Sequence, residues 1–239
     1  MLLGEDGLAR LSSARVAVVG AGGVGAYAAE MLARAGVGHI GIVDSDTVSE
    51  SNINRQLLAL RSTVGLAKVD VLRERILDIN PAADVSVVGE FLSEDNVGAI
   101  IERLFGPREG WDGELLCVID AIDTLSPKVA LAQYCVINGI PLVSSMGSGG
   151  KTDATQVRVV DISKTYECPL ARMMRSRLRK LGIEKGIQAV FSPEIPDKTG
   201  MVIEETRNKK SQVGSISYLP AVFGCVCAQA AIRRIAGIG

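Results

Sequence analysis

The sequence predicts an α/β protein with a Rossmann-like, doubly wound and mostly parallel sheet, followed by a C-terminal extension of short strands, loops and helices. Three observations support this prediction. Apolar β-like runs alternate with helical patterns over the first 146 residues, the first run breaks into four glycines, and the second run ends on Asp44. Such alternation is typical of parallel sheets with helices on both faces. The 239 residues, 47% of them hydrophobic, suffice for one large core.

Each element has its own signal in the sequence. Short apolar runs predict strands at residues 16–20, 39–44, 84–88, 115–120 and 142–145. Helical periodicity predicts helices that begin near Gly25, Lys68, Ser93 and Pro127. After a glycine-rich break at 147–151, we expect a strand at 156–161, a basic helix at 169–181 and an apolar helix at 219–232. Residues 183–217 show little periodicity, which predicts loops and short strands.

Composition excludes several classes of protein. No apolar run approaches the roughly 18 residues that span a bilayer, and the N-terminus lacks the basic flank of a signal peptide, so we expect a cytoplasmic protein with no membrane span. The five cysteines include no C-x-x-C pair, which argues against a disulfide framework and a structural zinc site. Cys168 is the most reactive candidate because Arg172 lies one helical turn away. Cys225 and Cys227 are expected to pack in the core.

The glycines after the first predicted strand indicate a site for nucleotide phosphates. Gly20 permits a tight turn, and Gly22 and Gly23 let the backbone approach the phosphates. Gly25 lets the next helix pack on the strand with its positive N-terminal end toward the anion. Asp44 follows Gly25 by nineteen residues, the distance expected for a carboxylate on the ribose hydroxyls.

Acidic residues end two of the predicted strands. The second run ends on Asp44 and the fourth ends on Asp120, and Asp123 lies three residues after Asp120. Because ligands of doubly wound sheets bind beyond the carboxyl ends of the strands, these groups and the glycine turn are expected to converge on one crevice.

The segment after Asp44 carries charge that a dehydrogenase does not need. Arg55 and, thirteen residues later, Lys68 place two cations beside the expected phosphates. Attack of a carboxylate on an α-phosphate needs such cations, since negative charge accumulates on the leaving pyrophosphate. Asp123 is the best candidate for a magnesium ligand. We therefore predict Arg55, Lys68 and Asp123 as catalytic residues that act on a nucleoside triphosphate with magnesium, and a monovalent cation stays an open option.

Five ordered motifs resemble those of the ubiquitin-activating-enzyme-like superfamily, which adenylates carboxylates with magnesium and ATP. They are the glycine turn at 20–25, Asp-Ser-Asp at 44–46, Ser-Asn-Ile-Asn-Arg-Gln at 51–56, Val-Gly-Leu-Ala-Lys at 64–68 and Asp-Ala-Ile-Asp at 120–123. The resemblance covers about residues 14–146. It implies contacts with ATP or metal for the matching residues Gly23, Asp44, Asn52, Arg55, Lys68 and Asp123. We also assign Asp46 of the second motif to the nucleotide site.

The second half resembles the branch of tRNA threonylcarbamoyladenosine dehydratases. The matching stretches are 141–165, Cys-Pro-Leu-Ala-Arg at 168–172, Val-Phe-Ser at 190–192 and Gly-Ser-Ile-Ser at 214–217. Branch members activate the threonyl carboxylate of a modified adenosine beside the tRNA anticodon and cyclise it with net loss of water. The resemblance thus implies tRNA as the substrate.

A basic segment fits that substrate. The chain has net charge −1, yet residues 164–210 hold 11 Lys/Arg against 6 Asp/Glu. A tRNA backbone would explain this asymmetry, and a solvated helix face is the alternative. We assign tRNA contacts to four residues of the predicted basic helix: Arg172, Arg175, Arg179 and Lys180.

The whole chain, 1–239, is expected to be one adenylate-forming domain. It divides into a nucleotide-binding core at 1–162, a basic insertion at 163–218 and a C-terminal helix at 219–239. The superfamily pairs such domains, and the last helix is more apolar than one buried face requires, so we expect a homodimer. Sulfur-transfer proteins are open as further partners, and no DNA partner is expected.

Three other functions stay under consideration. An adenylyltransferase for a small sulfur-carrier or ubiquitin-like protein often has two C-x-x-C zinc pairs, which this sequence lacks. A pseudoenzyme or binding subunit is considered because relatives carry an arginine that reaches the partner's ATP, upstream of the stretch matching residues 3–5. The sequence given has no residue that matches this arginine. An NAD-dependent oxidoreductase is disfavoured by Arg55 and Lys68.

Overall fold

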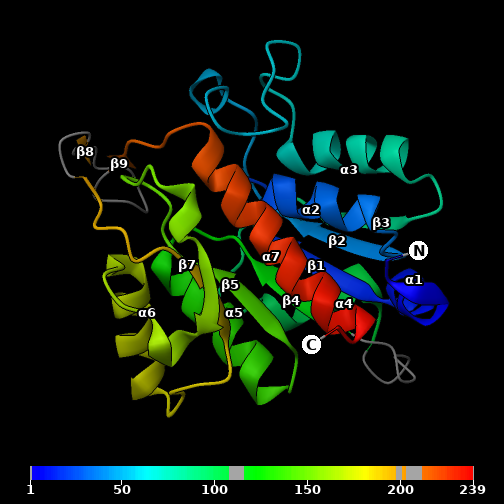
Figure 1. The fold of residues 1–239 in the computed structure, drawn as a ribbon. Coiled ribbons are helices and arrows are strands. Elements are labelled where there is room, and N and C mark those ends of the chain that lie inside the picture. Colours follow the sequence, from blue (N-terminus) through cyan, green and yellow to red (C-terminus); the bar gives the residue numbers. More distant parts are fainter. Residues whose placement is uncertain (1, 108–115, 198–200, 203–211, 239) are drawn as a thin grey trace.

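A seven-stranded sheet forms the centre of the protein (Figure 1). The structure is a computed structural model, and it describes residues 2–107, 116–197, 201–202 and 212–238. The strand order is β3-β2-β1-β4-β5-β7-β6, and every neighbouring pair is parallel except β6 with β7. The strands are β1 Arg15–Val19, β2 His39–Val43, β3 Asp84–Val88, β4 Leu116–Asp120, β5 Leu142–Ser145, β6 Arg158–Asp161 and β7 Gln188–Phe191. Two short strands, β8 Met201–Val202 and β9 Gln212–Val213, pair separately. The prediction of a mostly parallel α/β fold is confirmed.

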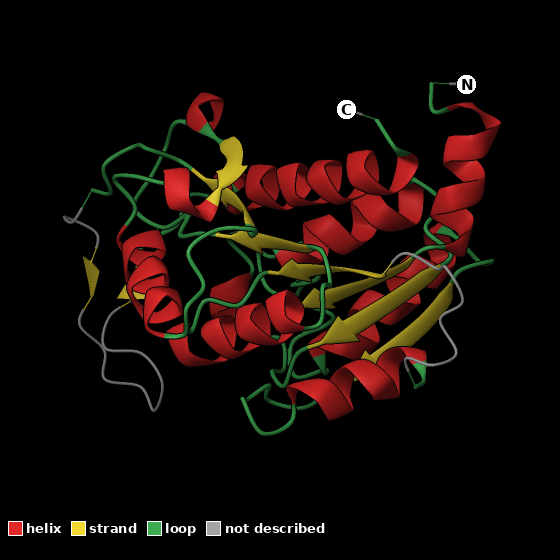
Figure 2. Cartoon of the chain, turned by 90° about the horizontal axis from the view of Figure 1, so that it is seen from below, coloured by secondary structure: helices red, strands yellow, loops and turns green. Residues whose placement is uncertain are grey.

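Helices cover both faces of the sheet, as Figure 2 shows. One face carries α1 Gly4–Ser13, α2 Gly25–Arg34, α3 Lys68–Ile79 and α7 Tyr218–Ala236, where α2 packs on α3 and α7, and α1 packs on α7. The other face carries α4 Val97–Phe105, α5 Leu125–Ile137 and α6 Pro169–Lys180, with α5 in contact with both of the others. Short 3-10 turns lie at η1 Glu50–Asn52, η3 Ala154–Gln156 and η4 Ile162–Lys164.

The central strands divide their side chains between two cores. In β1, Val16 and Val18 belong to the core shared with α2, α3 and α7, whereas Ala17 and Val19 belong to the core shared with α4, α5 and α6. Successive side chains of a strand point to opposite faces, so a strand buried on both faces has a continuous apolar sequence. This geometry explains why the short apolar runs predicted the strands correctly.

Several boundaries differ from the predictions. Helix α1 was not predicted; Gly7 and Leu11 are its buried residues, too few for a clear helical pattern. Helix α4 begins at Val97 instead of near residue 93, because the Asn96 side chain accepts a hydrogen bond from the Ser93 amide at 2.7 Å and closes a turn there. The strand predicted at 156–161 begins two residues later, as β6 at Arg158, because residue 156 is the last residue of η3. The predicted start of the fourth strand at residue 115 lies outside the described residues.

The largest difference concerns β7. It lies within residues 183–217, where loops and short strands were expected, and it is a short strand of four residues. However, it occupies an interior position of the central sheet, between β5 and β6. A four-residue apolar run gives no indication of its neighbours, so the sequence could not place it there.

Among the described residues, α7 is the one helix whose length and apolar character would allow it to cross a membrane. Half of its most apolar window is buried inside the protein, where it contacts α1, α2 and the central sheet. A core helix of a soluble domain passes the same test, so this feature is weak evidence for a membrane span.

Candidate functional site

The candidate site lies where the strand order reverses, between β1 and β4. In the sheet, β1 is flanked by β2 and β4, and Val19 stands in register with both Val43 and Asp120. The turns that follow these three strands therefore meet at one edge. Doubly wound sheets bind their ligands at this kind of switch point, and the positive N-terminal end of α2 begins there at Gly25.

The glycine turn is built for close approach of a ligand. Gly20 has φ +97°, and a Cβ on it would lie 2.8 Å from the Ala121 carbonyl oxygen. A Cβ on Gly25 would lie 1.7 Å from the Gly20 carbonyl oxygen, so only glycine fits there. Among the described residues, the backbone amides of Gly22 and Gly23 donate no hydrogen bond. Free amides at a helix N-terminus are suited to bind phosphate oxygens.

A chain of contacts links the glycine turn to Lys68. Asp44 accepts hydrogen bonds from the Ala21 amide at 2.6 Å and from the Asp46 amide at 2.8 Å. The Asp46 carboxylate in turn pairs with Lys68 Nζ at 2.8 Å. Burial raises the pKa of the Asp44 carboxyl, while Lys68 and the two amides act in the opposite direction. The side chain of Lys68 is only 5% exposed, so it is not a solvated lysine of a first helical turn.

The segment with Asn52 and Arg55 lies against the same turn. A Cβ on Gly23 would contact the Arg55 carbonyl oxygen at 3.3 Å and the Arg55 side chain at 3.6 Å. The Arg55 guanidinium donates to the Ser51 carbonyl at 2.9 Å and the Asn54 side chain at 2.7 Å. Asn52 is buried and accepts from the Ser49 amide at 3.2 Å, which shapes η1. The predicted cation Arg55 thus comes from a loop fixed by its own hydrogen bonds.

Asp123 and Asp120, expected in one crevice, have different positions. Asp123 is exposed at the carboxyl end of β4, where a ligand can reach it. Asp120 is 0% exposed and lies 2.8 Å from Nζ of Lys128, which is equally buried. The expectation that Asp120 lines the crevice is therefore wrong, because its charge is paired inside the protein. A charge of this kind must be paired when it is buried.

The basic helix α6 presents its cations unequally. Arg172, Arg179 and Lys180 are exposed, and Arg179 lies 4.0 Å from Glu184. Arg175 is half-buried and donates a hydrogen bond to the Thr165 hydroxyl. Arg172 and Arg179 are seven residues apart and so share one face of the helix. The part of the basic segment at 198–200 and 203–211 lies outside the described residues.

Four of the five cysteines are buried, where a substrate cannot reach their thiols. All five are free thiols, and Cys117, Cys135, Cys168 and Cys227 are buried. Burial raises the pKa of Cys117 and of Cys227 to about 12, which makes them inert. Cys168 was the most reactive candidate, but its thiol is buried and so lacks the exposure that a reactive thiol needs. Cys225, expected in the core, is exposed on α7.

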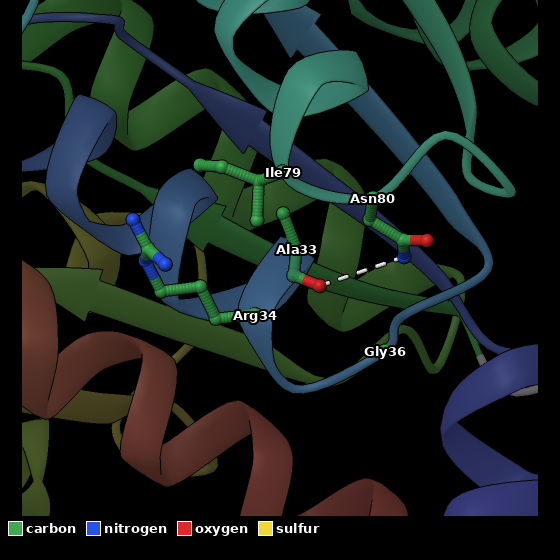
Figure 3. Close-up of a pocket in the computed structure, with 5 residues that line it drawn as sticks. All are labelled: Ala33, Arg34, Gly36, Ile79 and Asn80. Atoms are coloured by element: carbon green, nitrogen blue, oxygen red, sulfur yellow. Dashed lines mark hydrogen bonds between the residues drawn. The ribbon is translucent and has the colours of Figure 1, made fainter.

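A hollow of about 390 Å³ lies away from the candidate site, at the opposite edge of the sheet (Figure 3). It is lined by the C-terminal ends of α2 and α3, where the side-chain Nδ2 of Asn80 donates to the Ala33 carbonyl at 3.5 Å. The C-terminal ends of helices carry partial negative charge and disfavour phosphate. Arg34, which also lines it, is paired with Glu30 at 2.7 Å. This hollow is therefore no alternative nucleotide site.

Two groups of the site had no role in the sequence analysis. Gln56, the last residue of a quoted motif, is 8% exposed, and its Oε1 has no hydrogen-bond partner among the described residues. Its side-chain Nε2 lies 3.8 Å from the position of a Cβ on Gly22, so the Gln56 side chain borders the glycine turn, where its Oε1 would need a hydrogen-bond donor. Pro220 of α7 lies 3.1 Å from a Cβ on Gly23, although it is remote in sequence.

Comparisons with known proteins agree with this site. The model of the ThiF family matches residues 1–239. The tRNA threonylcarbamoyladenosine dehydratase of Bacillus subtilis (strain 168) is 43% identical over 234 residues, 95% of this chain and 88% of the relative. The crystal structures of E. coli tRNA N6-threonylcarbamoyladenosine dehydratase with ATP and with AMP each have a TM-score of 0.86 at 40% identity, and cover 99% of this chain and 91% of theirs. The chain therefore belongs to the ThiF family, in the branch that contains the tRNA threonylcarbamoyladenosine dehydratases.

Proposed function

We propose that this protein is an ATP-dependent tRNA threonylcarbamoyladenosine dehydratase that works through an adenylated carboxylate. The observation that carries the proposal is the glycine turn with free amides at the switch point, joined by Asp44 and Asp46 to the buried cation Lys68. Solved relatives at 40% identity bind ATP and AMP, the substrate and a product of adenylation chemistry. The expected cytoplasmic location agrees with tRNA as the substrate.

The proposed reaction has two steps. An oxygen of the threonyl carboxylate attacks the α-phosphorus of ATP, and pyrophosphate leaves. A nucleophile within the same modified adenosine then attacks the activated carbonyl, closes a ring and expels AMP. Free amides of the glycine turn, with Arg55 and Lys68, would stabilise the charge that builds up on the phosphates. Asp44 would accept hydrogen bonds from the ribose hydroxyls.

Magnesium fits this site only together with the nucleotide. Among the described residues, no group of three or more His, Cys, Asp or Glu side chains could hold a metal ion. Magnesium in nucleotide sites uses one or two carboxylates plus phosphate oxygens and water. Exposed Asp123, at the carboxyl end of β4, supplies one such carboxylate. When bound, the ion would neutralise charge on the triphosphate.

Mass spectrometry of tRNA nucleosides tests the function directly. In cells that lack the gene, threonylcarbamoyladenosine should accumulate in place of its cyclised form, and a plasmid copy should restore the cyclised nucleoside. Equal nucleoside profiles with and without the gene would contradict the proposal. A sulfur-carrier adenylyltransferase or a binding subunit would leave the cyclised nucleoside unchanged.

The nucleotide preference gives a first prediction. Calorimetry should show binding of ATP in the presence of magnesium and no binding of NAD, because Arg55 and Lys68 supply charge suited to a triphosphate. Tighter binding of NAD than of ATP would contradict adenylation chemistry.

The tRNA contacts give a second prediction. Arg172→Gln with Arg179→Gln should weaken tRNA binding and lower the slope of log affinity against log salt by about two units, since each removes about one phosphate contact. Both side chains are exposed on one face of α6, whereas Arg175 is held by Thr165. Filter binding over a salt series measures the slope, and ATP affinity should not change.

A matched pair controls for total charge. Arg10→Gln with Arg103→Gln removes two positive charges from exposed sites on α1 and α4. This control should keep the salt slope of the unmodified protein. If the α6 pair also kept it, α6 would be a solvated face and tRNA would bind elsewhere.

A homodimer is the third prediction. The outward side of α7 includes exposed Cys225 and half-buried Val222 and Ile232, which a partner could cover. Light scattering at micromolar concentration should give about twice the chain mass of 25.2 kDa. A monomer under these conditions would contradict the prediction. Binding of sulfur-transfer proteins is not needed for the proposed reaction.

A further inference from the structure

Asp120 and Lys128 form a fully buried ion pair beneath the candidate site. Lys128 Nζ lies 2.8 Å from Asp120 Oδ2, and both side chains are 0% exposed. Neither group can therefore touch a nucleotide at the surface of the turn. Replacing buried ion pairs by apolar residues is often neutral or stabilising, so stability by itself explains this pair poorly.

The pair binds both polar groups of one residue, Ile122. The Ile122 amide donates to Asp120 Oδ1 at 3.1 Å, and the Ile122 carbonyl accepts from Lys128 Nζ at 3.0 Å. On the other side, the Ser144 hydroxyl of β5 donates to Asp120 Oδ2 at 2.6 Å and holds the carboxylate in place. The backbone direction of Ile122 is thus fixed from within the core.

Ile122 lies between two parts of the nucleotide site. The residue before it, Ala121, places its carbonyl oxygen against Gly20 of the glycine turn. The residue after it is Asp123, which is exposed at the edge of the sheet. A change in the backbone of Ile122 would therefore move the carboxylate of Asp123 relative to the glycine turn.

We propose that the Asp120–Lys128 pair positions Asp123 for the metal-bearing triphosphate. This inference rests on the proposed function, since it assumes ATP and magnesium at the site. Asp120 and Lys128 are positioning residues that act through the backbone of Ile122. Groups that orient a metal ligand from behind typically change metal affinity by about 10- to 100-fold when they are lost. The pair should therefore act on the effect of magnesium, not on ATP binding as such.

Calorimetry of the variant Asp120→Asn with Lys128→Met tests this proposal. The variant removes both charges, so no unpaired charge stays buried, and it removes the donor to the Ile122 carbonyl. ATP affinity is measured with magnesium and again with EDTA. The factor by which magnesium tightens ATP binding should fall about 10-fold, while ATP affinity in EDTA stays within about 2-fold of the unmodified protein. The variant should thus resemble Asp123→Asn.

Two further variants separate positioning from folding. Ser144→Ala removes a partner of Asp120 but leaves the Ile122 contacts, so it should lower the melting temperature and keep the magnesium factor. Lys128→Arg keeps the pairing charge, but the donors of its larger, planar guanidinium cannot occupy the position from which Lys128 Nζ reaches both Asp120 and Ile122. Lys128→Arg should therefore lower the factor by which magnesium tightens ATP binding. It provides the test of the proposal if the double variant does not fold.

The outcomes distinguish the two proposals. If the unmodified protein does not bind ATP, the proposed function is wrong. If it binds ATP more tightly with magnesium and a folded pair variant keeps that factor unchanged, the pair is a folding element only and the positioning proposal is overturned.

Discussion

Loss of the charge at Lys68 should lower turnover by about 100-fold or more while ATP affinity changes only a few-fold. Lys68 is a buried cation held by Asp46, which Asp44 connects to the glycine turn. Its interaction with the nucleotide should strengthen as charge moves onto the leaving pyrophosphate. Removing the Lys68 charge should therefore destabilise the transition state more than the bound ATP of the ground state. Removing one such donor typically costs 10²- to 10³-fold in rate. Arg55→Ala should behave in the same way.

The measurement is single-turnover release of AMP with tRNA that carries threonylcarbamoyladenosine, together with calorimetric ATP affinity. Lys68→Ala and Lys68→Met form a matched pair, because both lose the charge but only alanine leaves a cavity in the core. Equal losses of turnover would assign the effect to charge. Weakened ATP binding with intact turnover would mean that Lys68 and Arg55 only bind the nucleotide.

Substitution of Gly25 by alanine should lower the free energy of unfolding by about 3 kcal/mol and abolish measurable ATP binding. An alanine Cβ would lie 1.7 Å from the Gly20 carbonyl oxygen and 3.2 Å from the Ala121 side chain. Backbone cannot yield as a flexible side chain can, so the glycine turn must move. The displaced amides of Gly22 and Gly23 would no longer face one anion.

Gly89→Ala is the matched control for this substitution. Gly89 is exposed after β3, and the nearest atom to its added Cβ would be a Val69 methyl at 3.9 Å. Alanine there should be neutral or stabilise by up to about 1 kcal/mol, because it reduces the entropy of the unfolded chain. Denaturant unfolding gives both free energies. Equal effects at the two positions would contradict the steric argument.

Local sequence patterns predicted the fold class and indicated where the nucleotide site lies. Apolar runs predicted the strands because a parallel strand buried on both faces must be apolar throughout. The glycines predicted the turn because Gly20 and Gly25 occupy places where a Cβ would meet backbone. The family that the motifs indicated is confirmed, whereas the individual roles of the site residues stay predictions until the variants above are measured.

Other features depended on contacts between distant parts of the chain. The sequence could not place β7 between β5 and β6, because strand neighbours are selected by the whole sheet. Arg172 and Arg175 lie on the same basic helix and look equivalent in the sequence, but the fold places Thr165 within hydrogen-bonding reach of Arg175. In the same way, Gln56 became a candidate contact only when its buried Oε1 was found without a partner among the described residues.

Asp120 and Asp123 show most clearly what each level determined. The sequence by itself determined that two carboxylates lie at the carboxyl end of β4, the edge where a nucleotide would bind. Only the tertiary structure decided their difference, by placing Lys128 of α5 and Ser144 of β5 around Asp120 and leaving Asp123 exposed. The physical reason is that a carboxylate is chemically the same at either position. Its role depends on whether the fold buries its charge against a cation in the core or exposes it at the surface where a ligand binds.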